Sequence, residues 1–232
     1  MTDGERGAPI ERLAVWDPWV RLVHWALVVL LPFSWWAAEN GLFRLHFLSG
    51  YTILTLVVFR IAWGFVGSET ARFGSFLRGP AAALRHFAHL RDRAAPPEVG
   101  HNAAGGWVVI LLLALLLAQT TSGLFADDLI FNRGPLARAV NEGWSSLASS
   151  VHLTVFWAIV GGAALHILAV IAYRVLFGRN LVRAMITGRL AVRATPRMRP
   201  PRMAGKLRGL VLLALSAALV FVIASRAPLP AF

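Results

Sequence analysis

The 232-residue chain contains no cysteine and only eleven acidic residues, and charged residues make up 15% of it. Without thiols the protein cannot hold disulfides, iron–sulfur clusters or zinc–cysteine sites, and it lacks the Cys-x-x-Cys-His run that attaches a c-type haem. Any redox-active metal centre must therefore be held by histidine or methionine. The shortage of charge also excludes an ordinary soluble domain, because 57% of the residues are hydrophobic and nine are tryptophan.

Five segments are apolar enough, and close enough to the ~20 residues that a membrane crossing requires, to be transmembrane helices. They are residues 20–38, 46–67, 107–125, 151–177 and 207–225. Asp17-Pro18, Gly105-Gly106 and Ser149-Ser150 are candidate starts of the first, third and fourth helices. The N-terminus has no short apolar core followed by a cleavage site, so we expect the first helix to be the insertion signal.

The formal charge of +12 comes from basic residues that lie between the apolar segments. This placement indicates that they set the membrane topology and do not form a nucleic-acid-binding surface. Eighteen Lys and Arg fall on the N-terminal side of the membrane and four on the other, with Arg60 inside the second span. We therefore predict a multi-pass, all-α membrane protein with the N-terminus inside and the C-terminus outside. Residues 1–190 would form a four-helix bundle, 191–206 a basic linker in contact with the lipid bilayer, and 207–225 an additional C-terminal transmembrane helix.

Four of the seven histidines, His24, His46, His152 and His166, lie within or at the edge of predicted spans. An ionisable side chain at membrane depth is costly, so it is a functional candidate, although any single one can be a neutral ring bonded to a carbonyl. Fourteen residues of helix turn by about 1400°, within about 40° of four full turns, and rise ~21 Å. His152 and His166 therefore share one face of one helix at opposite depths, which suits two stacked cofactors and not one metal.

The topology supplies a partner for each of these two rings. His24 begins the first helix near the inner surface and His46 begins the second near the outer surface, so the predicted pairs are His24 with His166 and His46 with His152. A flat macrocycle ligated by one imidazole on each face needs two facing helices of a bundle. The spacing predicts two non-covalent haems b, with iron atoms ~21 Å apart along the membrane normal.

Small and basic residues near these histidines are further candidates. Gly50 and Gly161-Gly162 leave room for a porphyrin or, alternatively, for close helix packing. The haem propionates need cations, and three arginines lie at suitable depths, although ordinary membrane anchoring explains them too. They are Arg21 and Arg60 near the inner surface and Arg44 near the outer one.

His101 lies before the third helix at the inner surface, where it fits an inner propionate, a quinone or a simple helix cap. His86 and His89 are interpreted as part of a basic interfacial helix.

Several motifs together resemble the bacterial cytochrome b561 family, which includes the b-type cytochrome subunit of Ni-Fe hydrogenases and, more distantly, the gamma subunit of formate dehydrogenase. They are VWDPWVRLVHW, LHFLSGY, RIAWGFVGSETARFGSFLRGP, GHNAAGGW and LVRAMITGR, spread over roughly residues 14–190. The resemblance implies a four-helix bundle with two haems b. Their ligands would be one histidine from each of the first two helices and two from the fourth, which are His24, His46, His152 and His166. It also implies quinone chemistry, more often near the inner haem.

The leading hypothesis is an electron conduit between a redox partner protein, such as a hydrogenase or a c-type cytochrome, and membrane quinone. A free-standing superoxide or quinone oxidoreductase is an alternative. A haem-free transporter with a histidine proton relay would need acidic residues or broken helices near the midplane, and the spans contain almost none. A haem-free structural subunit would leave the fourfold histidine pattern as coincidence.

Overall fold

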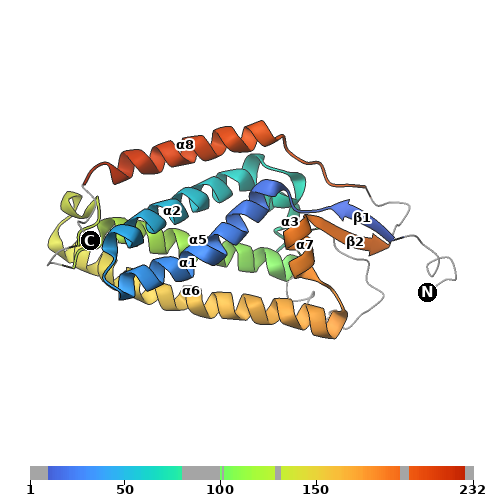
Figure 1. The fold of residues 1–232 in the computed structure, drawn as a ribbon, viewed down its shortest axis with the longest axis horizontal. Coiled ribbons are helices and arrows are strands. Elements are labelled where there is room, and N and C mark those ends of the chain that lie inside the picture. The colour runs from blue at the N-terminus through green and yellow to red at the C-terminus, as the bar shows by residue number, and fades with distance from the viewer. Residues whose placement is uncertain (1–9, 80–99, 101, 129–131, 194–198, 228–232) are drawn as a thin grey trace.

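The computed structural model describes residues 10–79, 100, 102–128, 132–193 and 199–227. Within these ranges five helices are long and apolar enough to cross a membrane: α1 Pro18–Glu39, α2 Phe43–Val66, α5 Ala103–Phe125, α6 Glu142–Phe177 and α8 Lys206–Ala224. The shorter elements are β1 Ile10–Ala14, η2 Glu69–Ala71, α3 Phe73–Phe76, η3 Ala137–Ala139, α7 Leu181–Thr187 and β2 Arg189–Arg193. The five predicted spans are thus confirmed as helices, and the chain folds as a helical membrane bundle (Figure 1).

Polar side-chain caps set the beginnings of three of the five membrane helices, α1, α5 and α6. The Asp17 carboxylate accepts a 2.9 Å hydrogen bond from the Val20 amide and Pro18 follows it, which confirms the predicted start of α1. Asn102 caps α5 in the same way through the Gly105 amide, at 2.6 Å. The predicted start at Gly105-Gly106 is therefore late by two residues, since the asparagine cap was missed.

The predicted start of the fourth helix at Ser149-Ser150 is wrong, because α6 begins at Glu142 under an Asn141 cap. Ser149 and Ser150 lie inside the helix, where their hydroxyls donate to the carbonyls of Ser145 and Ser146. Serine in mid-helix bonds back to the preceding turn in this way, so it does not mark a cap. With 36 residues, α6 is about 54 Å long and extends beyond a hydrocarbon layer of ~30 Å.

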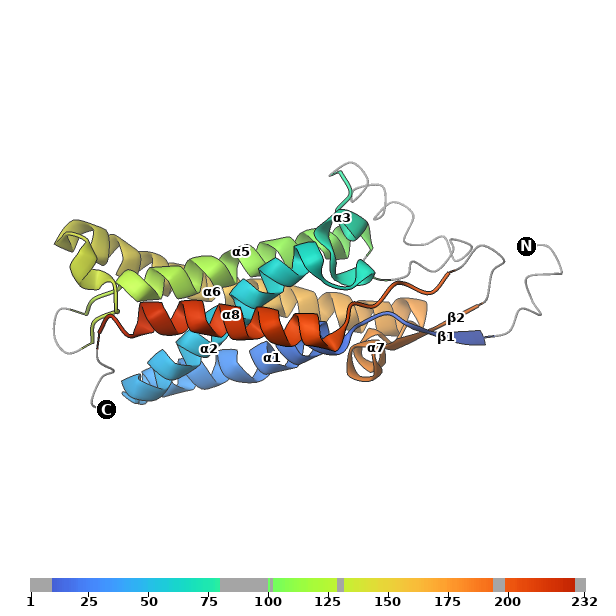
Figure 2. The ribbon, with the colours of Figure 1, turned by 90° about the horizontal axis from the view of Figure 1, so that it is seen from above.

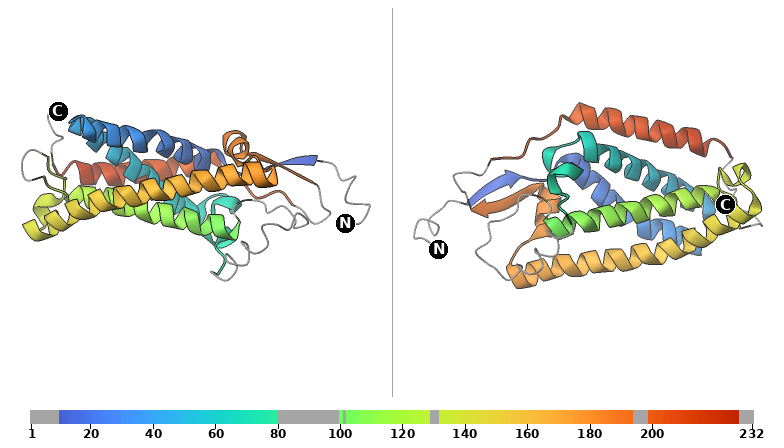
Figure 3. Two further views of the ribbon diagram at one scale, coloured as in Figure 1. Left: turned by 90° about the horizontal axis from the view of Figure 1, so that it is seen from below. Right: turned by 180° about the vertical axis from the view of Figure 1, so that it is seen from behind.

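The long helices lie side by side, and α2 is the most buried of the five (Figures 1 and 2). α1 packs against α2, α2 against α5, and α5 against α6. α8 packs on α2, on the side of the bundle away from α6 (Figures 1 and 3). The backbone of α6 makes few close contacts with α1 or α2. Side chains therefore bridge the space between α6 and the α1–α2 pair.

One end of the bundle carries a small two-stranded sheet that the all-helical prediction did not foresee. β1 pairs antiparallel with β2, with Ile10 opposite Arg193 and Ala14 opposite Arg189. The Val15 and Trp16 amides both donate to the Gly188 carbonyl, at 2.8 and 3.1 Å. We call the end with β1, β2 and α7 the sheet end, and the end with η3 the far end (Figure 1).

The fifth helix is fixed to the bundle along its length. Gly209 lies against the indole of Trp19, where a Cβ would meet the ring. Towards the far end, Val220 packs with Leu54 and Leu124. The chain before α8 is held by Glu69, whose carboxylate accepts from the Arg199 guanidinium at 2.7 Å and from the Arg202 amide at 3.0 Å.

Candidate functional site

Two histidine rings face each other at the far end of the bundle. His46 comes from the first turn of α2 and His152 from α6, with ring centroids 6.0 Å apart and an interplanar angle of 87°. His46 Nδ1 donates to the Ser34 carbonyl at 2.9 Å, and His152 Nδ1 donates to the Gln119 carbonyl at 2.8 Å. A carbonyl can only accept, so the proton of each neutral ring is on Nδ1 and the lone pair is on Nε2.

The third membrane helix shapes the pocket of His152. A Cβ on Gly123 of α5 would lie 2.9 Å from Cε1 and 3.1 Å from Nδ1 of that ring, so only glycine lets the imidazole approach. The Gln119 side-chain amide lies 3.2 Å from His152 Nε2, and its Oε1 is buried without a hydrogen-bond partner among the described residues. The Ser122 hydroxyl lies 3.5 Å from His152 Nδ1. One glycine and three polar groups of α5 thus surround the ring.

The second pair lies towards the sheet end. His24 of α1 and His166 of α6 have ring centroids 6.4 Å apart and an interplanar angle of 64°. In the described part of the chain, His24 Nδ1 and Arg21 Nε are buried and have no hydrogen-bond partner. Buried polar atoms are nearly always satisfied in folded proteins. Two of them on adjacent turns of α1 indicate a place where a polar group of a ligand would bond.

An apolar layer separates the two pairs. Ile159 lies seven residues from each histidine of α6, hence on the same face, and it is 5% exposed. It packs with Ile53 and Val57 of α2, and with Leu116 of α5. Three leucines of α1 pack against the same cluster, Leu27, Leu30 and Leu31. The two histidine pairs are therefore separate sites with hydrocarbon between them.

The remaining predicted residues lie at varied distances from these pairs. Arg60 is buried in another network, where its Nη1 donates to the Ala71 carbonyl at 3.3 Å and its guanidinium stands 5.6 Å from the Phe73 ring centre. Arg44 is exposed at the far end, two residues before His46. His101, His86 and His89 lie outside the described residues.

The predicted glycines differ in what surrounds them. Neither Gly50 nor Gly161 has another protein atom within 4 Å of a Cβ position, whereas at Gly162 a Cβ would lie 3.0 Å from Leu112. Gly162 therefore serves close packing between α6 and α5. Gly50, one turn after His46, leaves space on the side of α2 that carries the ring.

The contributions of the first and third helices to the far-end site were not predicted from the sequence. Ser34 and Gln119 act partly through backbone carbonyls, which carry no sequence signal. Gly123 stands in the run QTTSG near the end of a span, where five polar or small residues interrupt an apolar segment. That cluster was the available signal, because polar side chains in a span face the bundle interior.

The donor geometry fits a metal held between two imidazoles. A ligating imidazole nitrogen lies about 2 Å from its metal, so opposed rings on one metal have centroids about 6 Å apart. Both observed separations, 6.0 and 6.4 Å, match this value. A helical membrane bundle with paired histidines between facing helices is what a membrane cytochrome of b type requires.

Comparison with known families agrees with that class. A family model described as prokaryotic cytochrome b561 matches residues 15–188. The chain therefore belongs to the prokaryotic cytochrome b561 family, which confirms the resemblance seen in its motifs. Membership makes it an integral membrane protein of electron transfer by b-type haem. No curated protein and no solved structure matches the chain.

Proposed function

We propose that the four histidines would hold two haems b, with His24 and His166 at the sheet end and His46 and His152 at the far end. The facing rings, each pair contributed by two helices, are the observation that carries this proposal. A b-type haem held by two imidazoles would supply single-electron transfer and not oxygen chemistry.

The surrounding side chains support different tasks at the two sites. The Ser34 and Gln119 carbonyls hold the far-end rings in the tautomer that leaves the Nε2 lone pair for a metal, which raises ligand basicity. At the sheet end, Arg21 would bond a propionate, which its buried Nε without a partner among the described residues supports. Arg44 would serve a propionate at the far end. Gly50 would give the far-end macrocycle room.

Charge favours an orientation with the sheet end inside. Most arginines of the described chain lie at that end, and positive residues stay on the cytoplasmic side of a bacterial inner membrane. The proposed conduit then runs between a redox partner protein outside, of hydrogenase or c-type cytochrome kind, and quinone near the inner pair. Residues 1–190 would form the haem-bearing unit, 191–206 a linker and 207–225 the additional helix.

The layer around Ile159 favours electrons over protons as the species that crosses. A proton relay needs a chain of polar groups across the membrane. The seven residues of this layer, from α1, α2, α5 and α6, are all leucine, isoleucine or valine. Electrons tunnel through such a layer, whereas protons and ions do not pass.

Purified protein in vesicles that enclose ferricyanide, with a membrane-impermeant reductant outside, tests this function. We expect the wild-type protein to reduce the internal ferricyanide, and His24→Ala and His152→Ala each to stop it, because each breaks one site. His89→Ala is the matched control, since it removes a histidine outside the proposed sites. Equal reduction rates in the wild-type protein and in a His24→Ala/His152→Ala double variant would refute the proposal.

A further inference from the structure

A groove lies between the end of α2 and the start of α8, at the sheet end. Its volume is about 430 Å³, and its lining is one arginine and five apolar side chains: Val66, Leu207, Arg208, Val211, Leu212 and Leu215. Three of the apolar residues are largely exposed, with Leu207 at 72%, Val211 at 51% and Leu215 at 62%. Exposed apolar side chains on two membrane-crossing helices face hydrocarbon, so an acyl chain is the chemically suited occupant of this groove.

The mouth of the groove is positively charged. Arg208 Nη1 donates to the Val66 carbonyl at 3.1 Å, which holds the guanidinium over the end of α2. A guanidinium has five N–H donors, so Arg208 has donors left for a second acceptor. Lys206 lies two residues earlier and is exposed. None of the lining residues is acidic, and the nearby Glu69 is already paired with Arg199.

We propose that this groove binds an anionic phospholipid of the membrane. Arg208 bonds its phosphate, Lys206 adds positive charge at the same end of α8, and an acyl chain lies along Val211 and Leu215. Basic pockets between transmembrane helices on the cytoplasmic side suit anionic headgroups, and charge-assisted bonds from arginine to phosphate are strong. The lipid would join α8 to α2 at the place where the additional helix begins.

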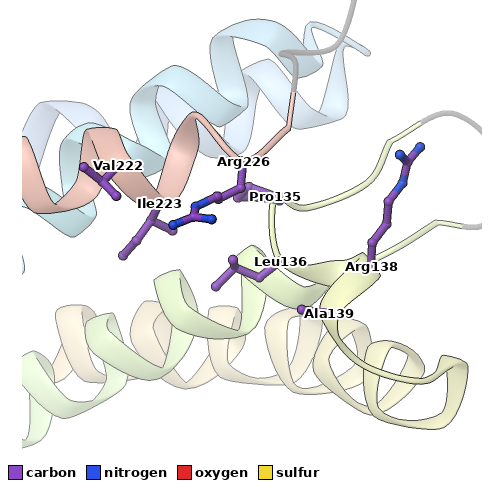
Figure 4. Close-up of a pocket in the computed structure, with 7 residues that line it drawn as sticks. All are labelled: Pro135, Leu136, Arg138, Ala139, Val222, Ile223 and Arg226. Carbon is purple, nitrogen blue, oxygen red and sulfur yellow. The ribbon is translucent and has the colours of Figure 1, made fainter.

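A second hollow at the far end does not have the same charge convergence. It holds about 440 Å³ between η3 and the end of α8, and both Arg138 and Arg226 line it. Figure 4 shows the Arg138 side chain pointing away from Arg226, so the two guanidinium groups do not converge on one anion. The carbonyls that end α8 also carry partial negative charge there. Arg226 is therefore the matched control for Arg208, at the opposite end of the same helix.

Native mass spectrometry of the full-length protein tests the proposal, with phosphatidylglycerol and phosphatidylcholine of the same acyl chains at equal concentration. We expect the wild-type protein to retain phosphatidylglycerol preferentially. Arg208→Gln should lower the ratio of the two adducts about tenfold, because one charge-assisted contact is lost. Lys206→Gln should lower it by less, and Arg226→Gln should leave it unchanged. Leu215→Trp, which fills the groove, should reduce bound lipid of both kinds.

Three results would overturn the proposal. One is equal retention of both lipids by the wild-type protein. Another is loss of preference in Arg226→Gln as large as in Arg208→Gln. The third is displacement of the phosphatidylglycerol adduct by inorganic phosphate at the lipid concentration, which would mean a site for free anions. Should Arg208→Gln not fold, Lys206→Gln and Leu215→Trp still decide. The haem content of every variant should equal that of wild type, so failure here is distinct from failure of the proposed electron transfer.

Discussion

Replacing Gly123 with alanine is expected to weaken haem binding at the far-end site specifically. The new methyl would lie 2.9 Å from Cε1 of His152, closer than a carbon–carbon contact allows. To relieve it, the ring must move away from α5 and lengthen its 2.8 Å bond to the Gln119 carbonyl. Loss of that bond costs about 1 kcal/mol, and the overpacking as a whole costs about 1–3 kcal/mol. The affinity for the far-end haem should therefore fall about five- to hundredfold.

Gly161→Ala is the matched control, because it adds the same methyl to a neighbouring helix where no other protein atom lies within 4 Å. Alanine improves helix propensity over glycine by about 1 kcal/mol, and this gain is common to both variants, so their difference isolates the contact with His152. Haem titration of apoprotein, followed by the b-type absorption band, gives both affinities. Equal far-end affinities in Gly123→Ala and Gly161→Ala would refute this reasoning.

Three further changes test separate parts of the structure. Gln119→Leu removes a side-chain amide that competes with haem for Nε2 of His152, and it removes a buried oxygen without a partner among the described residues. The affinity for the far-end haem should rise a few-fold in the same titration. A fall in that affinity would contradict the competition. The Arg202 amide and the Arg199 guanidinium lower the pKa of the Glu69 carboxyl below the ordinary 4.5. The charged carboxylate therefore stabilises the folded protein fully above pH 4.5. This stabilisation is lost as the pH falls through the lower pKa that the carboxyl has in the folded state. Thermal unfolding should then be less sensitive to acid below pH 4.5 in Glu69→Gln than in wild type, and equal sensitivity would contradict it. Gly209→Leu puts a side chain into the indole of Trp19 and should destabilise the docking of α8, seen as faster proteolysis before that helix, with no loss of haem.

Much of the fold could be predicted because membrane helices leave a direct signal in the sequence. Each of the five helices is a long apolar segment. Asp17-Pro18 marks the start of α1 by ordinary capping chemistry. The histidine pairs followed from helical rise and alternating topology, and the structure brings together the same rings that depth had paired. These pairs could be predicted because the periodicity of a helix and the membrane depth of each residue follow from the sequence and the order of the spans.

The parts that sequence reasoning missed depend on contacts between helices. Ser34 and Gln119 act through carbonyls, and which carbonyl a ring meets depends on how two helices cross. The pairing of β1 with β2 was hidden because arginines alternating with apolar residues also read as membrane anchors. Arg60 was assigned by depth alone, whereas its partners, Ala71 and Phe73, follow the helix that carries it.

The pyridine haemochrome assay, with protein determined by amino-acid analysis, measures the number of haems b per chain and so decides whether there are two bis-histidine sites. We expect two haems in the wild-type protein, one in His152→Ala or His46→Ala, and none in His152→Ala/His166→Ala. His89→Ala should keep both. A wild-type protein with fewer than two haems, or a His152→Ala variant that keeps two, would contradict the assignment of two bis-histidine sites.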